Sequence, residues 1–138
     1  NDRGEPWVIG VDPPSPENDG ISGERKLENY LSLSNKALAT SGSYRKFYVK
    51  DGQKFSHTID PKTGYPVQHN LLSVTVIGND AATCDAYATA FMTMGVDRTL
   101  DFVNENKVLD LDVYLLFENA SGRIERAYSE GMKNYFLD

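Results

Sequence analysis

The chain has 138 residues, of which 40% are hydrophobic and 25% charged, a composition typical of an ordinary globular domain. Its 14 Lys and Arg against 20 Asp and Glu give a formal net charge of -6, so the chain has no overall positive charge to attract the phosphate backbone of a nucleic acid. No run approaches the roughly 18 apolar residues that a membrane-spanning helix needs. Nucleic-acid binding and an integral membrane protein are therefore excluded, and we expect a single domain over residues 1–138.

Few side chains could bind a soft metal ion. The single cysteine, Cys84, excludes an intramolecular disulfide and any zinc site with several cysteines. Only His57 and His69 could supply ring nitrogens, so a site made of nitrogen ligands is also hard to build. A bound metal would be held mostly by oxygen, which favours a hard ion such as Mg²⁺.

The first third of the sequence predicts strands separated by polar segments. A strand is expected at Trp7–Val11, followed by a surface loop over residues 12–24, where three prolines fall within four positions. Short apolar alternations follow over residues 27–33 and 36–40. The Ser-Gly-Ser run at residues 41–43 is expected to interrupt the pattern and to expose backbone N–H groups.

A β-hairpin is the clearest local prediction in the sequence. Tyr44–Val49 and Lys54–Ile59 have strand-like composition, and the Asp51–Gly52 pair between them is typical of a tight hairpin turn. The next segment, Asp60–Pro66, contains two prolines and is predicted to be a loop.

A strand and a helix dominate the middle of the chain. Leu71–Ile77 is rich in β-branched residues and predicts a strand. A helix capped by Asn79 or Asp80 is expected to run to about Met94 and to end at Gly95. Because it would carry one apolar stripe, we expect its cysteine to be a buried, inert thiol. The stripe consists of Cys84, Tyr87, Ala88, Phe91 and Met92.

The last third predicts a second helix and two more strands. The helix is expected over about Val96–Asn106, and the strands over Leu111–Phe117 and Arg123–Tyr128, joined by a turn at residues 119–122. Strands, then helices, then strands indicate an α+β fold with a mainly antiparallel sheet and the helices packed on one face.

One candidate site combines Asp85 and Thr89 on the predicted helix. Residues four apart lie about one turn apart, so both oxygens rise from the same strip of surface. A carboxylate and a hydroxyl there could hold Mg²⁺ together with water and substrate phosphate oxygens. The alternative is a solvated Asp and a Thr that bonds back to its own helix. Spacing alone leaves both interpretations open.

Two further segments have polar side chains suited to phosphate chemistry. In Ser56–Gly64, His57 could act as a general base beside a proline-stiffened turn, or could fill a half-buried position next to an ordinary turn. In Ala39–Tyr44, small hydroxyl residues around a glycine could approach a phosphate closely, or form a plain turn between strands. The residues by themselves favour the simpler alternative in each case.

The order of these segments closely resembles the ApbE family of bacterial FAD:protein FMN transferases. The resemblance is strong from Trp7 to about Gly95 and looser over the last strands. It implies an ApbE-like, T-fold-related α+β fold. The segments that carry it are Thr40–Arg45, Ser56–Pro66, Leu72–Ile77, Asp85–Ala90 and Met94–Gly95.

The resemblance also implies an activity and roles for individual residues. FAD would be split at its pyrophosphate with the help of Mg²⁺, FMN would be esterified to a Thr or Ser hydroxyl of a target flavoprotein, and AMP would leave. Asp85 and Thr89 match the metal ligands of the family, and His57 matches its catalytic histidine. The residues that resemble the flavin-binding segment and the loop shaping the same cleft are Thr40, Ser41, Gly42, Asp60 and Thr63.

Family members are considerably longer than this chain, which resembles their C-terminal half. The chain starts at Asn1 without an initiator Met, so we expect a processed or cut product. The missing N-terminal half would supply the rest of the FAD pocket and a further metal ligand. We therefore expect the isolated chain to be inactive, and its uncovered apolar surface to favour self-association.

Two alternative functions and one location remain open at this stage. The same site could belong to a FAD pyrophosphatase, which produces FMN and AMP without a protein acceptor, or to a flavin-binding or interaction module without turnover. The resemblance implies a location in the bacterial cell envelope, either periplasmic or anchored to the membrane by lipid.

Overall fold

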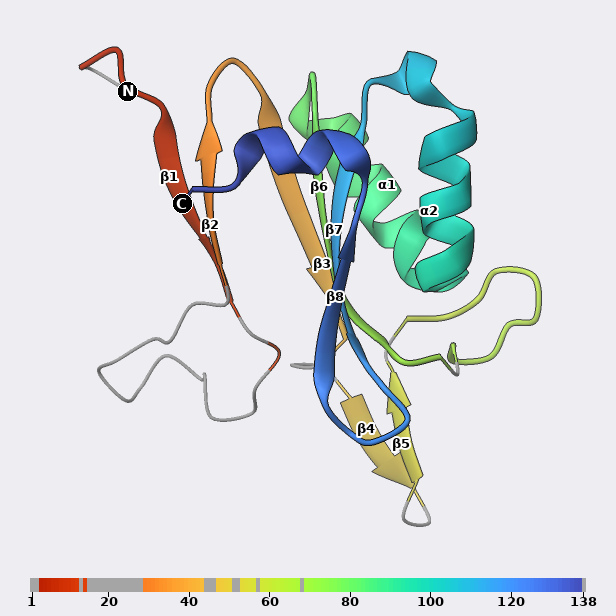
Figure 1. Ribbon diagram of the computed structural model, residues 1–138. Helices are drawn as coiled ribbons and strands as arrows, with labels where there is room; N and C mark the ends of the chain where they lie inside the picture. The colour runs from red at the N-terminus through yellow and green to blue at the C-terminus, as the bar shows by residue number, and fades with distance from the viewer. Residues whose placement is uncertain are drawn as a thin grey trace.

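A four-stranded antiparallel sheet forms the centre of the molecule, with strand order β3-β6-β7-β8 (Figure 1). Its strands are β3 (Ala37–Gly42), β6 (Leu71–Gly78), β7 (Asp112–Glu118) and β8 (Ile124–Tyr128). The computed structural model describes residues 3–12, 14, 29–43, 47–50, 53–56, 58–67 and 69–137. Strand β6 lies in the interior of this sheet, as its run of apolar and β-branched residues predicts.

Two smaller antiparallel pairs accompany the sheet. Strand β1 (Trp7–Val11) pairs with β2 (Asn29–Leu33), and β4 (Phe47–Lys50) pairs with β5 (Gln53–Ser56). The second pair confirms the predicted hairpin strands in shorter form, because Lys50 is directly opposite Gln53. The Asp51–Gly52 turn and nearly all of the loop predicted for residues 12–24 lie outside the described residues.

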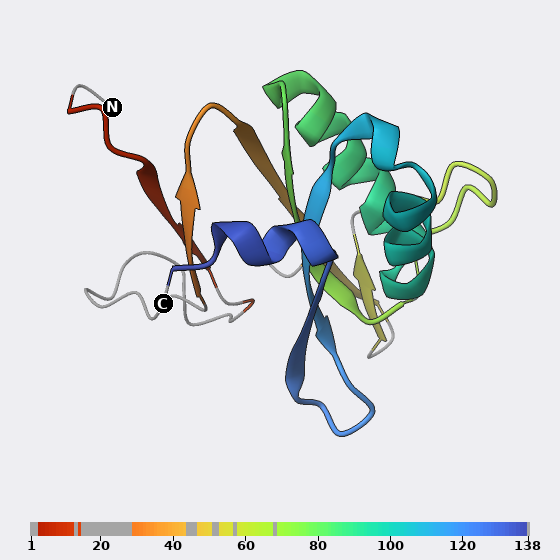
Figure 2. The ribbon, with the colours of Figure 1, turned by 45° about the horizontal axis from the view of Figure 1, so that its top comes forward.

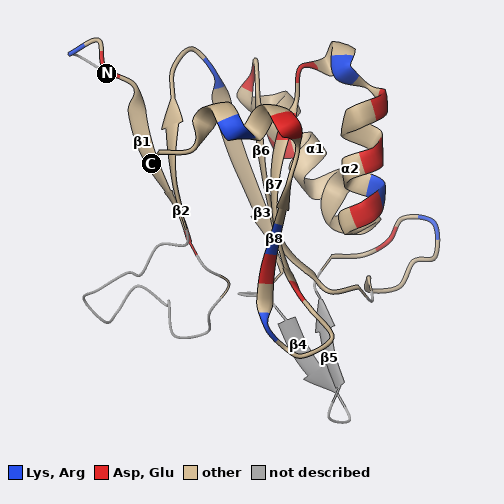
Figure 3. Cartoon of the chain, in the orientation of Figure 1, with Lys and Arg blue, Asp and Glu red and all other residues tan. Residues whose placement is uncertain are grey.

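Two helices follow β6 in the positions that the sequence predicts. Helix α1 (Ala81–Met94) is capped by Asp80, whose Oδ1 accepts the Thr83 N–H at 2.8 Å. Gly95 ends this helix with φ of 82°, and α2 (Val96–Glu105) begins at once. Acidic and basic residues are spread along α2 (Figure 3). Within the described residues, no helix is long and apolar enough to cross a membrane.

The sheet buries both of its faces. Helices α1 and α2 cover one face, whereas the β1–β2 pair and the 3-10 helix η2 (Glu130–Tyr135) lie on the other (Figures 1 and 2). Because successive strand residues point to opposite faces, neighbouring positions of β6 and β7 belong to two separate cores. The helix-side core includes Val74, Val76, Ala88, Phe91, Val113 and Leu115. The other core includes Leu31, Leu33, Ile77, Tyr114, Leu116 and Met132.

The fold class is confirmed: the structure is α+β with antiparallel sheets and helices packed on a sheet. One local prediction was wrong. Residues 41–43 do not interrupt the chain, because β3 continues through Gly42, which pairs with Ser73, and the Ser43 N–H donates to the Leu72 carbonyl at 2.9 Å. Pairing with a buried neighbouring strand outweighs the weak strand preference of Ser and Gly. The 3-10 helices η1 (Lys107–Leu109) and η2 were not predicted.

Candidate active site

Helix α1 presents Asp85 and Thr89 on its exposed side. Their neighbours Cys84 and Ala88 are fully buried against the sheet, which orients the helix and leaves the carboxylate and the hydroxyl at the edge of the packed face. The two candidate ligands therefore lie one turn apart on accessible surface, as their spacing predicts.

The Thr89 hydroxyl lies against β3. Its Oγ1 is 3.3 Å from the Oγ of Ser41. Ser41 reaches the helix because β3 alternates, and Ala37 and Ala39 on the same face pack into the helix-side core. Thr89 does not bond back to its own helix, because the partner of its hydroxyl is Ser41 of β3. The contact joins one candidate metal ligand to the candidate flavin-binding segment.

The other two residues of that segment face the opposite side of the sheet. Thr40 Oγ1 lies 2.8 Å from the Oγ1 of the buried Thr75. Thr40 and Gly42 also line a cavity of about 310 Å³ between β1 and β3. The flavin-binding segment predicted from the sequence is therefore divided between two faces, with Ser41 alone beside α1. The remaining lining residues are Ile9, Gly10, Val11, Asp12, Leu38 and Thr75.

Asp60 and Thr63 shape a compact loop. Asp60 Oδ1 accepts the Lys62 N–H at 2.8 Å, and Thr63 Oγ1 accepts the Tyr65 N–H at 3.3 Å. The backbone closes the same turn, because the Gly64 N–H donates to the Asp60 carbonyl at 2.8 Å. Gly64 has φ of 73°, a left-handed conformation that glycine adopts without strain. Both side chains thus stabilise the turn, and any contact with substrate would be additional.

The predicted base, His57, lies outside the described residues. The other histidine, His69, has a structural environment that sequence reasoning missed. Its Nε2 lies 2.7 Å from the carbonyl of Met92 in the last turn of α1, and its Nδ1 lies 3.3 Å from the Leu71 nitrogen. No local pattern could indicate this contact, because Met92 is 23 residues away in the chain.

The donors on α1 fit part of the coordination shell of Mg²⁺. Among the described residues, no group of three or more His, Cys, Asp or Glu side chains could hold a metal ion. Mg²⁺ is typically bound through one or two carboxylates, with water and phosphate oxygens completing its six positions. Asp85 and Thr89 suit such a site only if a bound substrate and other groups supply the remaining ligands.

Cys84 lies on the buried side of α1, away from the exposed Asp85 and Thr89. Its side chain is fully buried, and its Sγ lies 3.6 Å from the carbonyl of Ala37. Burial raises the pKa of the thiol above its ordinary value, which disfavours the reactive thiolate. The expected burial of the thiol is confirmed, and that it is inert stays a prediction.

Comparison with known proteins identifies the class. The model of the ApbE family matches residues 1–115. The FAD:protein FMN transferase of Haemophilus influenzae is 36% identical over 129 residues, which are 94% of this chain and 35% of that protein. The chain therefore belongs to the ApbE family, as the order of its motifs indicates.

Solved structures agree with this assignment. The ApbE protein of Thermotoga maritima matches with a TM-score of 0.75 and 34% identity, over 100% of this chain and 40% of that one. The flavin transferase ApbE of Vibrio cholerae matches with a TM-score of 0.75 and 31% identity, over 99% and 40%. The chain thus spans well under half the length of the relatives that it matches.

Proposed function

We propose that this chain forms part of the active site of a FAD:protein FMN transferase. The observation that carries the proposal is the placement of Asp85, Thr89 and Ser41 in a chain of the ApbE family: a carboxylate and a hydroxyl on the accessible side of α1, with the hydroxyl 3.3 Å from the strand hydroxyl. The relatives named above are themselves described as FAD:protein FMN transferases or as a flavin transferase.

The proposed reaction moves FMN from FAD to a hydroxyl group. The acceptor oxygen of a Thr or Ser in the target flavoprotein forms a bond to the phosphorus of the FMN part, and the bond from that phosphorus to the bridging oxygen breaks. AMP leaves with the bridging oxygen, and the hydroxyl proton passes to a base. From the family resemblance, we assign the role of this base to His57.

Asp85 and Thr89 would hold Mg²⁺ on the accessible side of α1, where the bound ion supplies positive charge to neutralise the phosphate oxygens. Ser41 keeps the Thr89 hydroxyl directed toward β3 through their contact. Asp60 and Thr63 hold the compact loop in one shape. The contribution of this chain is therefore mostly the positioning of groups, which is the main requirement of phosphoryl transfer.

A test uses the full-length protein that contains this chain, with FAD, Mg²⁺ and a target domain carrying the acceptor residue. Flavin that stays on the target through denaturing electrophoresis and fluoresces in the gel supports the transferase. Release of AMP and FMN without labelled target supports a FAD pyrophosphatase instead. Binding of FAD without either product supports a flavin-binding module and contradicts the proposed enzyme.

Two proposals concern the setting of the enzyme. We expect the 138-residue chain alone to cleave no FAD, because it holds only part of the ligand shell, and measurable cleavage would contradict this. We also propose that the full-length protein resides in the bacterial cell envelope, in the periplasm or anchored by lipid. Fractionation of cells that express it tests this location, and recovery with the cytosolic enzymes would contradict it.

A further inference from the structure

His69 connects three parts of the chain through one imidazole ring. The Leu71 backbone N–H can only donate, so Nδ1 accepts this bond at 3.3 Å. The ring proton is then on Nε2, which donates to the carbonyl of Met92 at 2.7 Å. The ring therefore ties the start of β6 to the end of α1, two residues after the loop over residues 58–67.

The carbonyl that His69 binds would otherwise lack a partner within the helix. Helix α1 ends at Met94, and the last four carbonyls of an α-helix have no N–H four residues further on inside it. Gly95 brings the backbone next to the ring, because a Cβ added there would lie 3.5 Å from Cδ2 of His69. The end of α1 and the imidazole are thus packed together as well as hydrogen bonded.

The loop that precedes His69 is closed on itself. The Val67 N–H donates to the Thr58 carbonyl at 3.0 Å, and Ile59 forms an isolated β-bridge with Pro66. With the Asp60 turn inside it, this loop should move as one unit. Its C-terminal stem leads into His69, so the ring is well placed to fix the whole loop relative to α1.

We propose that His69 is a positioning residue of the transfer site. It fixes the position of the loop that carries Asp60 and Thr63 relative to α1, the helix that carries Asp85 and Thr89. The expected effect on turnover rests on the proposed function. The hydrogen bonds of His69 are independent of that function. His69 itself needs no contact with FAD or with the acceptor.

Two conservative variants separate the two bonds of the ring. His69→Gln retains an amide nitrogen that reaches the position of Nε2 and can donate to the Met92 carbonyl. His69→Asn carries its amide oxygen near the position of Nδ1. It therefore keeps the hydrogen bond from the Leu71 N–H and loses the hydrogen bond to the Met92 carbonyl of α1. A matched control is Asn70→Ala, which removes the 2.7 Å bond from Asn70 Nδ2 to the Glu118 carbonyl, a link to β7 and not to α1.

The variants are compared in the full-length protein by FMN transfer at saturating FAD and acceptor. We expect kcat to fall about 10-fold to 10²-fold in His69→Asn, since misplacement of reacting groups by about 1 Å can cost 10²-fold. His69→Gln should stay within about threefold of the parent, because it keeps the helix bond, and so should Asn70→Ala. Equal losses in the Asn and Gln variants, or an equal loss in Asn70→Ala, would overturn the proposal.

A second readout is independent of turnover. Backbone ¹⁵N order parameters for the non-proline residues of 58–67 should fall from the rigid range, about 0.85, toward about 0.6 in His69→Asn. They should remain in the rigid range in His69→Gln and Asn70→Ala. Unchanged order parameters in His69→Asn would overturn the inference, whereas a parent protein that transfers no FMN would contradict the proposed function alone.

Discussion

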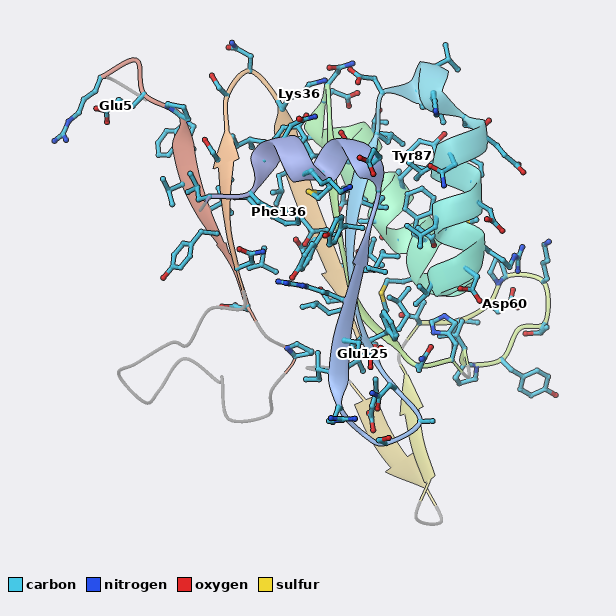
Figure 4. All side chains as sticks on the ribbon, viewed as in Figure 1. Glu5, Lys36, Asp60, Tyr87, Glu125 and Phe136 are labelled. Carbon is cyan, nitrogen blue, oxygen red and sulfur yellow. The ribbon has the colours of Figure 1, made fainter. Side chains whose placement is uncertain are left out.

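The two ends of the central sheet use polar side chains in opposite ways. At the end where β3 begins, the ammonium of Lys36 donates to Asp110 Oδ2 at 2.6 Å and to Asn79 Oδ1 at 2.8 Å. Asn79 also donates to Asp110 at 3.1 Å. This cluster of Lys36, Asn79 and Asp110 joins the segments before β3, after β6 and before β7, and Figure 4 shows Lys36 there.

Where β3 ends, the polar groups are turned toward solvent or toward one another. Thr89 contacts the Ser41 hydroxyl there, and the compact loop carrying Asp60 extends from this end, far from Lys36 in Figure 4. Asp85 is exposed one helical turn before Thr89, on the part of α1 that lies between the two ends. At the first end a carboxylate has its charge partner within the chain, which is the pattern of a structural contact. The exposed carboxylate of Asp85, by contrast, has no charge partner among the described residues, which leaves it open to an external ligand.

The largest expected effect comes from removing the exposed carboxylate of α1. Asp85→Ala should lower Mg²⁺-dependent FMN transfer by about 10³-fold or more, because it removes the carboxylate that we propose as the charged metal ligand. Transfer is followed by covalent flavin fluorescence while Mg²⁺ is titrated. Asp101→Ala on α2 removes another exposed carboxylate and should leave the rate unchanged. Near-normal transfer by Asp85→Ala would contradict its assignment as a ligand.

The next largest effect concerns the proposed base. His57→Ala should lower the rate of transfer on the order of 10²-fold, the usual contribution of a general base, while FAD still binds. Turnover, FAD affinity and melting temperature are measured on one preparation of the full-length protein. A lower melting temperature with a normal rate would make His57 a structural residue. Weaker FAD binding with a normal rate at saturation would make it a nucleotide contact.

A smaller effect distinguishes the two faces of β3. Ser41→Ala removes the partner of Thr89 and should lower kcat/KM for transfer about tenfold, since a poorly directed ligand weakens the site. Thr40→Ser retains the hydroxyl that meets Thr75 on the other face and should change kcat/KM by less than about twofold. If Thr40→Ser were the more damaging change, the substrate would have to bind on the side of the 310 Å³ cavity.

The smallest effect is expected at the other end of the sheet. Lys36→Ala should lower the melting temperature by only about 1 to 3 °C and leave transfer unchanged, because the Asp110 side of the ion pair is exposed to solvent. The hydrogen bond to Lys36 holds the pKa of Asp110 below its ordinary value of 3.8, and the bond to Asp110 raises the pKa of Lys36 above 10.5.

The effect of Lys36→Ala on the melting temperature should depend on pH, because the pKa of Asp110 is lowered and the pKa of Lys36 is raised. A lowered carboxyl pKa stabilises the fold above the ordinary Asp value and loses this effect as acid protonates the group. A raised ammonium pKa stabilises the fold below the ordinary Lys value and loses this effect as base removes the proton. The difference in melting temperature between the parent and Lys36→Ala should therefore be greatest between about pH 5 and 10 and should shrink outside that range. A difference that grows below pH 3 would contradict the ion pair.

Patterns local in sequence predicted most of the fold. The cap at Asp80, the end at Gly95 and the buried stripe of α1 are set by residues within a few positions of one another, and the structure confirms them. The break expected after Thr40 was wrong because strand pairing with distant residues of β6 decided the conformation there.

The candidate site was less accessible to sequence reasoning. The spacing of Asp85 and Thr89 predicted their common strip, but the partner of Thr89 is Ser41, which is 48 residues away. Thr40 and Ser41 lie on opposite faces of the sheet because side chains alternate along β3. The sequence pattern predicted that this strand ends at Thr40, so it could not show this division. The contact of His69 with Met92 depends on where a loop returns to a helix, which no local pattern encodes.

The most direct test of the account is the position of the metal ion in the full-length protein. Crystals grown with FAD and with Mn²⁺ in place of Mg²⁺ would show the ion by its anomalous scattering. We expect an anomalous peak coordinated by the Asp85 carboxylate and the Thr89 hydroxyl, next to the phosphates of FAD, and no such peak in Asp85→Ala crystals. A peak bound only by residues away from α1, with FAD in place, would contradict the assignment of this helix as the metal-binding element.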